Sequence, residues 1–134
     1  ISATRAPLLV AAQQLRDFNL PYQLGWTNEG GTKPFEAPSN ANVGTVPVFA
    51  DDIIVMATDG LFDNVALETV AEVCDQWEHS DKSGSLAERL CDEARRRSLD
   101  DAVDSPFALL AKENDVMWGG GMPDDVTVVC LEVS

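Results

Sequence analysis

The stretch DIIVMATDGLFDNV, residues 52–65, decides the fold, because one pattern ends within it and another begins. Residues 53–57 are apolar at successive positions, as in a strand that is covered on both faces. After Asp59 the apolar residues recur every three or four positions, which predicts a helix over about residues 64–78. A buried strand therefore ends on a carboxylate, and the chain then turns at once into a helix.

Two further helices and a second strand are expected after this turn. Asp63 or Asn64 is the predicted N-cap of the first helix. A second helix begins after Ser85, which opens an S-x-x-E capping box, and a third begins at residues 105–106, with proline in the first helical position. The run VTVVCLEV, residues 126–133, is typical of a second strand that is apolar on both faces.

The residues before the buried strand carry weaker patterns. Two short apolar runs within residues 7–26 indicate extended pieces around a turn, with a helix over the first run as the alternative. Residues 27–44 are rich in Gly, Pro, Asn and Glu, which predicts a mobile loop. Asp51 and Asp52 separate the strand from a short run that ends at Phe49, which predicts a tight hairpin. A strand-rich start, one helical block and a final strand predict an α+β sandwich.

Length and charge limit the classes of protein to consider. The 134 residues, 45% of them hydrophobic, suffice for one core, so we expect one domain or a piece of one. The formal net charge of −14, from 23 acidic and 9 basic side chains, argues against a direct nucleic-acid or anionic-membrane partner. No apolar run approaches the roughly 20 residues of a membrane span. Three cysteines without a C-x-x-C pair argue against a zinc site and favour an intracellular protein.

Two acidic turns flank the two predicted strands. Asp59 ends the first strand, and Asp124 and Asp125 precede the second. If the strands are antiparallel neighbours, these carboxylates share one edge of the sheet. Two carboxylates about 4 Å apart repel by roughly 1 kcal/mol in water and about 4 kcal/mol at an effective dielectric constant of 20, so the cluster favours a cation or a proton. Oxygen ligands without His or Cys favour Mg²⁺ or Mn²⁺.

Glycines accompany both acidic turns, and both turns also have a simpler explanation. Gly60 follows Asp59, and residues 119–121 are three glycines that precede Asp124. Glycine permits positive φ angles and close backbone approach. However, Asp-Gly is a common turn dipeptide, the pair at 124–125 can cap a strand, and the acidic excess can be a solvating surface. The spacing alone leaves metal binding and a purely structural role open.

Four blocks of sequence, in order, resemble the type 2C family of metal-dependent protein phosphatases (the PPM family). The blocks are QQLRDFNLPYQLG at 13–25, DIIVMATDGLFDNV at 52–65, SPFALLAKEN at 105–114 and GGMPDDVTVVCLEV at 120–133. They are most similar to the compact branch that includes mitochondrial-matrix phosphatases and relatives of the bacterial sporulation phosphatase. The resemblance implies the C-terminal part of an α-β-β-α sandwich, with residues 1–134 as a single partial domain, and a mitochondrial location.

The resemblance also implies roles for individual residues. Asp59 is expected to bridge toward a binuclear Mg²⁺ or Mn²⁺ centre, and Asp124 to be a direct ligand. Asp125 and Asp63 are expected to orient the ligands, with helix capping as the alternative for Asp63, and Gly60 to let the backbone approach. The implied activity is hydrolysis of phosphoserine or phosphothreonine in a phosphoprotein substrate by a metal-activated water, with no catalytic residue beyond the metal ligands.

The chain departs from the family pattern as well. A complete domain is about twice as long, and its first half carries the other metal aspartates, a phosphate-binding arginine and an acidic histidine. None of these motifs occurs here, since Arg5 lies in no such context and His79 lies at a polar helix end. The 134 residues alone are therefore not expected to be active. The alternatives are a catalytically inactive phosphatase-like scaffold or assembly subunit with protein partners in a larger complex, and an unrelated acidic metal-binding module.

Overall fold

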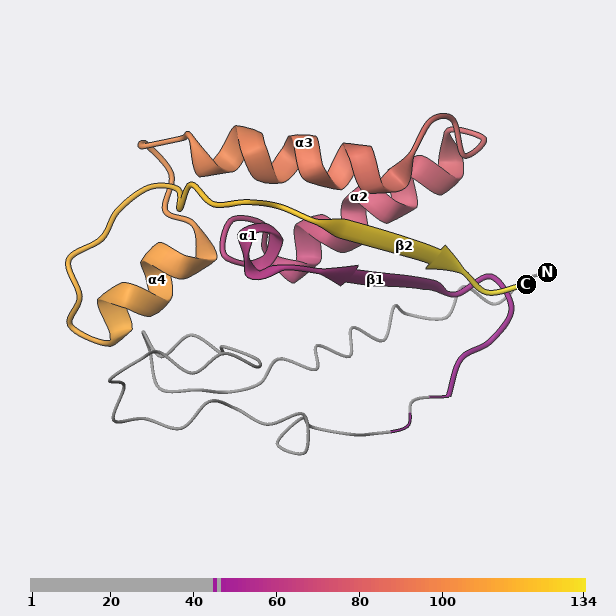
Figure 1. Cartoon of the computed structure of the whole chain (residues 1–134), viewed down its shortest axis with the longest axis horizontal. Coiled ribbons are helices and arrows are strands. Elements are labelled where there is room, and N and C mark those ends of the chain that lie inside the picture. The colour runs from indigo at the N-terminus through magenta and orange to yellow at the C-terminus, as the bar shows by residue number, and fades with distance from the viewer. Residues whose placement is uncertain (1–44, 46) are drawn as a thin grey trace, which may run out of the picture. The chain divides into compact units, whose positions relative to one another are not determined.

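A computed structural model of the chain describes residue 45 and residues 47–134. The part from Val48 to Ser134 belongs to one compact unit. Its elements follow in the order β1 (Ile53–Ala57), α1 (Asp59–Phe62), α2 (Leu67–His79), α3 (Leu86–Ser98), α4 (Pro106–Glu113) and β2 (Val128–Glu132). Strands β1 and β2 form an antiparallel pair, and α2 and α3 pack on one face of it (Figure 1). The predicted α+β class is confirmed.

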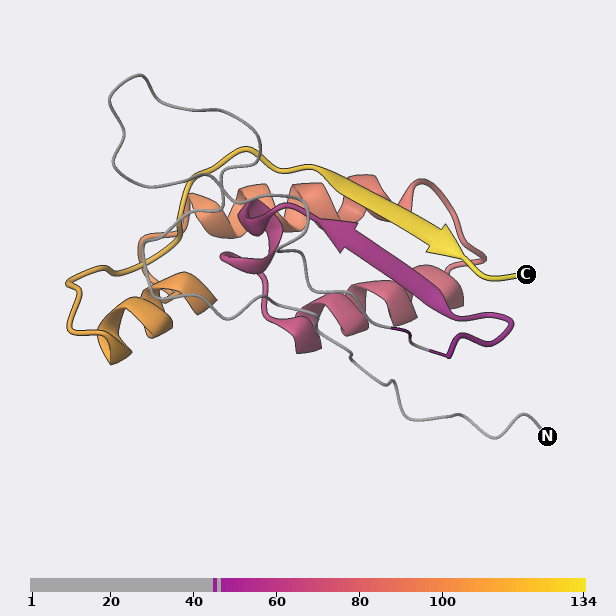
Figure 2. The same ribbon diagram turned by 60° about the horizontal axis from the view of Figure 1, so that its bottom comes forward.

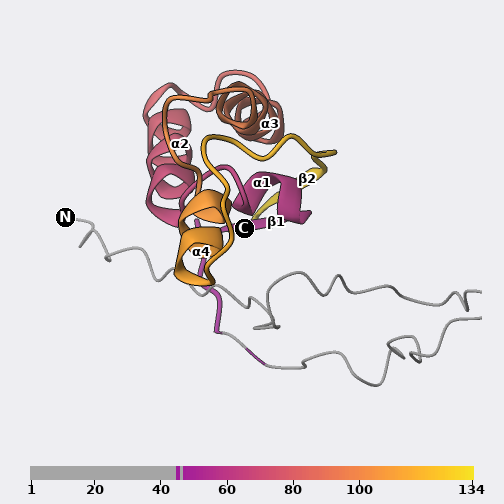
Figure 3. The same cartoon turned by 90° about the vertical axis from the view of Figure 1, so that its left-hand side faces the viewer.

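The core lies between the sheet and helices α2 and α3, as an end-on view shows (Figure 3). On α3 the buried positions Leu86, Leu90 and Ala94 are four residues apart, so they line a single face of the helix. They meet Leu61 and Val65 from the turn after β1, which are fully buried. This contact fixes α1, and with it the end of β1, against the helical layer.

The two faces of the sheet differ in burial. Alternate side chains point to opposite faces of a strand. One set packs on the core, namely Ile53, Val55, Ala57, Val128 and Cys130. The apolar residues between them, Met56, Val129 and Leu131, are 50%, 46% and 48% exposed. The sequence predicts apolar residues on both faces, and within the described part of the chain one face is the better covered.

Helices α3 and α4 begin where the sequence predicts. The Ser85 hydroxyl accepts a hydrogen bond from the Glu88 N–H at 3.3 Å, which is half of the predicted capping box. The Ser105 hydroxyl accepts one from the Ala108 N–H at 3.1 Å. Proline at position 106 follows this cap, where its missing N–H costs nothing. Both starts are set by side chains within three residues of the cap.

The start of α2 differs from the prediction. The helix begins at Leu67, and its N-cap, Ala66, makes no side-chain hydrogen bond. Asp63 is instead the C-cap of the short helix α1. The prediction that Asp63 or Asn64 caps a helix from about residue 64 is therefore wrong for α2.

The predicted hairpin before β1 is also wrong. Asp51 does lie in a turn, with φ of 71°. Residues 47–49 are not a strand, however. The turn pairs with the far end of β2 instead, since the Asp51 N–H donates to the Val133 carbonyl at 2.8 Å and the Val133 N–H donates to the Asp52 carbonyl at 2.9 Å. The apolar run at 53–57 thus pairs with a strand 71–79 residues later.

Helix α4 docks on the turn that follows α1 (Figure 2). The Phe107 N–H donates to the Asp63 carbonyl at 3.0 Å.

Across residue 45 and residues 47–134, no helix combines the length and apolar character that a membrane crossing requires. The expected extended pieces within 7–26 and the expected mobile loop at 27–44 lie outside the described residues.

Candidate functional site

The end of β1 and the start of β2 lie at the same edge of the sheet. Ala57 is paired with Val128 in the antiparallel register. The pairing continues one residue further, because the Thr58 N–H donates to the Thr127 carbonyl at 3.0 Å and the Thr127 N–H donates to the Thr58 hydroxyl at 3.1 Å. The prediction that both acidic turns lie at one edge is confirmed.

Asp59 and Asp124 hold their carboxylates in the same local way. Asp59 Oδ1 accepts a hydrogen bond from the Gly60 N–H at 3.0 Å, and Asp124 Oδ1 accepts one from the Asp125 N–H at 2.7 Å. Both side chains are on the exposed edge. No Lys, Arg or His in the described part of the chain forms an ion pair with them. Oxygen-only donors of this kind, which no basic side chain neutralises, fit a hard divalent cation.

The pKa of the Asp63 carboxyl is affected by the negative charge of the edge. Burial, followed by the charges of Asp59 and Asp124, raises the pKa of the Asp63 carboxyl from 3.8 to about 6. The two candidate ligands therefore act on a third carboxyl at the same edge. Within the described residues, no three His, Cys, Asp or Glu side chains are grouped so that they could hold a metal ion. A complete metal site would need further ligands.

The raised pKa of Asp63 predicts a pH-dependent stability. The folded state binds the Asp63 proton more tightly than the unfolded state, so the free energy of unfolding falls as the pH rises between the two pKa values, 3.8 and about 6. Asn at this position carries no charge at any pH. In chelator-treated full-length protein, Asp63→Asn should raise Tm by a few degrees above about pH 6.5 and leave it unchanged near about pH 4.

Thermal unfolding followed by circular dichroism across this pH range measures the difference. A Tm difference between Asp63→Asn and wild type that is the same at every pH would show that ionisation of Asp63 does not destabilise the folded state.

Asn64 joins the two acidic turns. Its side chain is 1% exposed. Its Nδ2 donates to the Gly60 carbonyl at 2.9 Å and to the Met122 carbonyl at 2.7 Å. Its Oδ1 accepts from the Met122 N–H at 2.8 Å. One buried amide thus binds the residue after Asp59 and the main chain two residues before Asp124.

Gly60 brings the same two segments into close contact. A Cβ atom on Gly60 would lie 2.4 Å from the Asp125 carbonyl oxygen and 3.2 Å from Val126 Cγ2. Its φ is not positive. Close approach, and not a left-handed conformation, therefore explains the glycine after Asp59. In the second turn Gly120 does have a positive φ, of 76°.

Gly121 serves close packing in the second turn. A Cβ there would lie 2.3 Å from the Arg97 carbonyl oxygen and 2.4 Å from that of Ser98. The loop before β2 is thereby held against the end of α3. Such contacts with main-chain atoms leave little freedom for a larger residue.

Known proteins resemble the chain in sequence and in fold. Residues 45–103 match the family model described as protein phosphatase 2C. A solved structure titled as that of the photosystem II phosphatase PBCP superposes with a TM-score of 0.73 and 28% sequence identity, over 90% of this chain and 49% of that one. The predicted resemblance to the protein phosphatase 2C family is confirmed in sequence and in fold.

Curated relatives align with nearly the whole chain. The protein phosphatase PTC7 homolog fig of Drosophila grimshawi is 38% identical over 127 residues, which is 90% of this chain and 41% of the relative. The 5-azacytidine resistance protein azr1 of Schizosaccharomyces pombe is 34% identical over 131 residues, which is 88% of this chain and 42% of the relative. The chain thus spans about two-fifths of the length of these phosphatase relatives.

The described histidine and two arginines of α3 have partners within their own helices. His79 ends α2 with an exposed side chain, and its hydrogen bond with the Asp75 carbonyl raises its pKa. In the last turns of α3, Arg96 and Arg97 both pair with Glu93. The two guanidinium groups share one carboxylate within α3, which accounts for their position without an anion site.

The cysteines are packed side chains. All three are free and partly buried. Burial raises the pKa of the Cys74 thiol to about 11, and it also raises that of Cys130. A thiol with a raised pKa is a poor nucleophile at neutral pH. The thiols of Cys74 and Cys130 are therefore poorly suited to act as nucleophiles.

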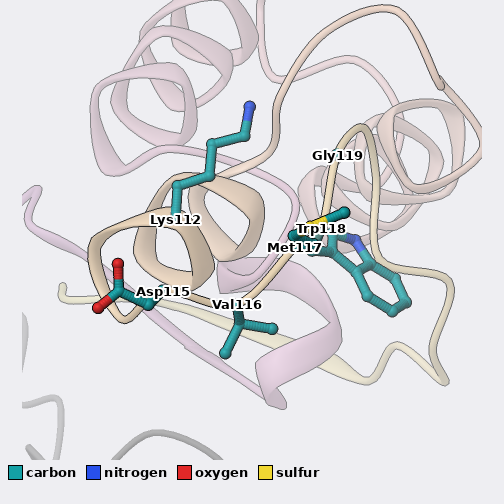
Figure 4. A pocket seen from close by; sticks show the side chains of 6 residues that line it. All are labelled: Lys112, Asp115, Val116, Met117, Trp118 and Gly119. Atoms are coloured by element: carbon teal, nitrogen blue, oxygen red, sulfur yellow. The ribbon is translucent and has the colours of Figure 1, made fainter.

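A hollow beside α4 is a separate feature (Figure 4). It is lined by the last turn of α4 and the loop that follows, from Lys112 to Gly119. Met117 is 98% exposed there. Lys112 forms an ion pair with Asp104, which lowers the pKa of Asp104. The hollow contains none of the candidate metal ligands.

Proposed function

We propose that this chain is the C-terminal part of a metal-dependent protein serine/threonine phosphatase, and that Asp59 and Asp124 bind Mg²⁺ or Mn²⁺ in it. The observation that carries the proposal is the pair of acidic turns at one sheet edge. Burial, followed by the charges of Asp59 and Asp124, raises the pKa of Asp63 there. Carboxylates that lie close together repel each other, and a divalent cation relieves that repulsion. The similarity of residues 45–103 to the protein phosphatase 2C family supports the same function.

The chain's own residues would position the ligands. In each ligand one carboxylate oxygen is held by the following N–H, at Gly60 or at Asp125, which leaves the other oxygen for a cation. Asp63 and Asp125 lie beside them and would orient the ligands or share their charge. When bound, divalent cations would supply a water of lowered pKa and neutralise charge on the phosphoryl oxygens.

Substrate and location are part of the proposal. The proposed substrate is a phosphoprotein, since relatives carry the name protein phosphatase. Phosphoserine or phosphothreonine as the target is proposed from the resemblance to the type 2C family. The remaining metal ligands would come from sequence outside these 134 residues, as the two-fifths coverage of the relatives allows. An intracellular, mitochondrial location stays a prediction from the resemblance.

A catalytically inactive, phosphatase-like scaffold is the second candidate. It is favoured by one observation, that within the described residues no group of three potential ligands could hold a metal ion. In a scaffold the acidic edge would persist without a functional centre. Metal binding together with hydrolysis separates the two candidates.

The experiment is hydrolysis of phosphoserine and phosphothreonine peptides by the full-length protein. Phosphate release should require Mn²⁺ or Mg²⁺, stop after treatment with a chelator, and return when Mn²⁺ is added back. Release that survives complete metal removal would contradict the metal-dependent mechanism. Metal binding without any release would favour the scaffold.

A further inference from the structure

The buried amide of Asn64 has more contacts than a turn residue needs. Its carbonyl oxygen and its NH₂ group together make three hydrogen bonds of 2.7–2.9 Å, all of them to main-chain atoms. Two of the three are to Met122, which is 58 residues away in sequence. At 1% exposure, water cannot replace these bonds if the amide is removed.

The partners of Asn64 lie next to the candidate ligands. Gly60 immediately follows Asp59, and Met122 is two residues before Asp124. The bond to Gly60 is local, since it joins positions four residues apart. The pair of bonds to Met122 ties the second acidic turn to the first on the N-terminal side of Asp124.

The other contacts between the two turns lie on the C-terminal side of Asp124. Gly60 meets the Asp125 carbonyl closely, and the Thr58 hydroxyl donates to the same carbonyl at 3.3 Å. Thr58 also pairs with Thr127. These contacts hold the chain after Asp124, and the short, doubly bonded link from Asn64 to Met122 restrains the chain before it.

We propose that Asn64 is a positioning residue, whose side-chain amide fixes the loop that carries Asp124 against the turn that carries Asp59 and thereby sets the affinity of the edge for divalent cations. The inference rests on the proposed function, because it takes both aspartates as ligands. Asn64 itself touches neither metal nor substrate. Residues that orient metal ligands typically change metal affinity by about 10–100-fold when they are replaced.

Two variants of the full-length protein separate the local bond from the long-range link. Asn64→Ala removes all three hydrogen bonds. Asn64→Ser keeps a hydroxyl that can donate to the carbonyl four residues back, at Gly60, but is too short to reach Met122. Asn64→Ser is therefore the variant with the better prospect of folding, and it removes only the link between the turns.

The readout is the Kd for Mn²⁺, measured by calorimetry, beside Tm and phosphopeptide hydrolysis. Both variants should raise the Kd by about tenfold or more, and a higher Mn²⁺ concentration should restore kcat. Trp77→Ala is the matched control, since it removes a side chain that packs on the core near Ile53 and Glu132, at the end of the sheet opposite the acidic turns, and should lower Tm. Its Kd should be that of wild type.

The outcomes separate this inference from the proposed function. If Asn64→Ser binds Mn²⁺ as tightly as wild type, Asn64 has only a structural role and the inference is wrong, whatever happens to Tm. If Trp77→Ala weakens Mn²⁺ binding as much as Asn64→Ser does, general destabilisation explains the effect and the inference is again overturned. Wild-type protein that binds no Mn²⁺ would overturn the proposed function, and this inference with it.

Discussion

Asp59→Asn and Asp124→Asn should each reduce Mn²⁺-dependent phosphopeptide hydrolysis by the full-length protein by more than about 100-fold. The estimate is a lower bound, because residues that merely orient metal ligands already contribute 10–100-fold. Asparagine keeps the shape of aspartate and an oxygen that can accept from the Gly60 or the Asp125 N–H. The change therefore removes the charge that attracts the cation and leaves the turn in place.

Asp92→Asn is the matched control, because Asp92 is exposed on α3 and makes the same isosteric exchange away from the sheet edge. Its activity should equal that of wild type. The metal-free ligand variants carry a second signature, since removing either charge should lower the pKa of Asp63, as carbon-detected NMR can measure. Wild-type activity in Asp59→Asn or Asp124→Asn would remove that residue from the metal site.

The parts of the fold that sequence predicts well are those fixed by neighbours in the chain. The start of α3 depends on Ser85 and the residue three positions on, and the start of α4 on Ser105 and the proline after it. These signals need no knowledge of the rest of the molecule. The antiparallel pairing of the two apolar runs is only a condition of the acidic-turn prediction, because residues that are apolar on both faces do not fix the pairing.

The predictions fail where a residue hydrogen-bonds to a partner that is far away in the sequence. Asn64 resembles a helix cap in the sequence, but its amide binds Met122, so α2 begins without a side-chain cap. The turn at Asp51 resembles a hairpin, but it pairs with Val133. No local pattern identifies either contact. The only sequence signal at Asn64 was a polar residue between the apolar residues Leu61 and Val65. In the structure both of these neighbours are fully buried.

Gly60 shows how a correct residue can be explained by the wrong physics. The sequence offered two reasons for the glycine, a positive φ and a close approach of the backbone. Its φ is not positive, and a Cβ would lie 2.4 Å from the Asp125 carbonyl oxygen. The two reasons predict the same residue but different consequences of replacing it, so a mutation distinguishes them.

Gly60→Ala should destabilise the full-length protein by about 1–3 kcal/mol, the usual cost of forcing extra atoms into a packed site. Two effects oppose each other. Gly60 lies in helix α1, where alanine is intrinsically favoured over glycine by about 1 kcal/mol. The added Cβ, however, meets a main-chain oxygen, which cannot rotate away as the end of a side chain can. The Asp125 carbonyl must therefore move, and Asp124 with it, so Mn²⁺ affinity should fall together with stability.

Gly119→Ala is the comparison that isolates this contact, because its Cβ would meet only Asp104 Oδ1, at an ordinary 3.6 Å. Its effect on urea unfolding should stay within about 0.5 kcal/mol, and its Mn²⁺ Kd should be that of wild type. If Gly60→Ala were instead as stable as wild type or more so, helix propensity would outweigh the contact with Asp125. The two acidic turns would then be less tightly packed than the 2.4 Å approach implies, and Asn64 would carry most of their positioning.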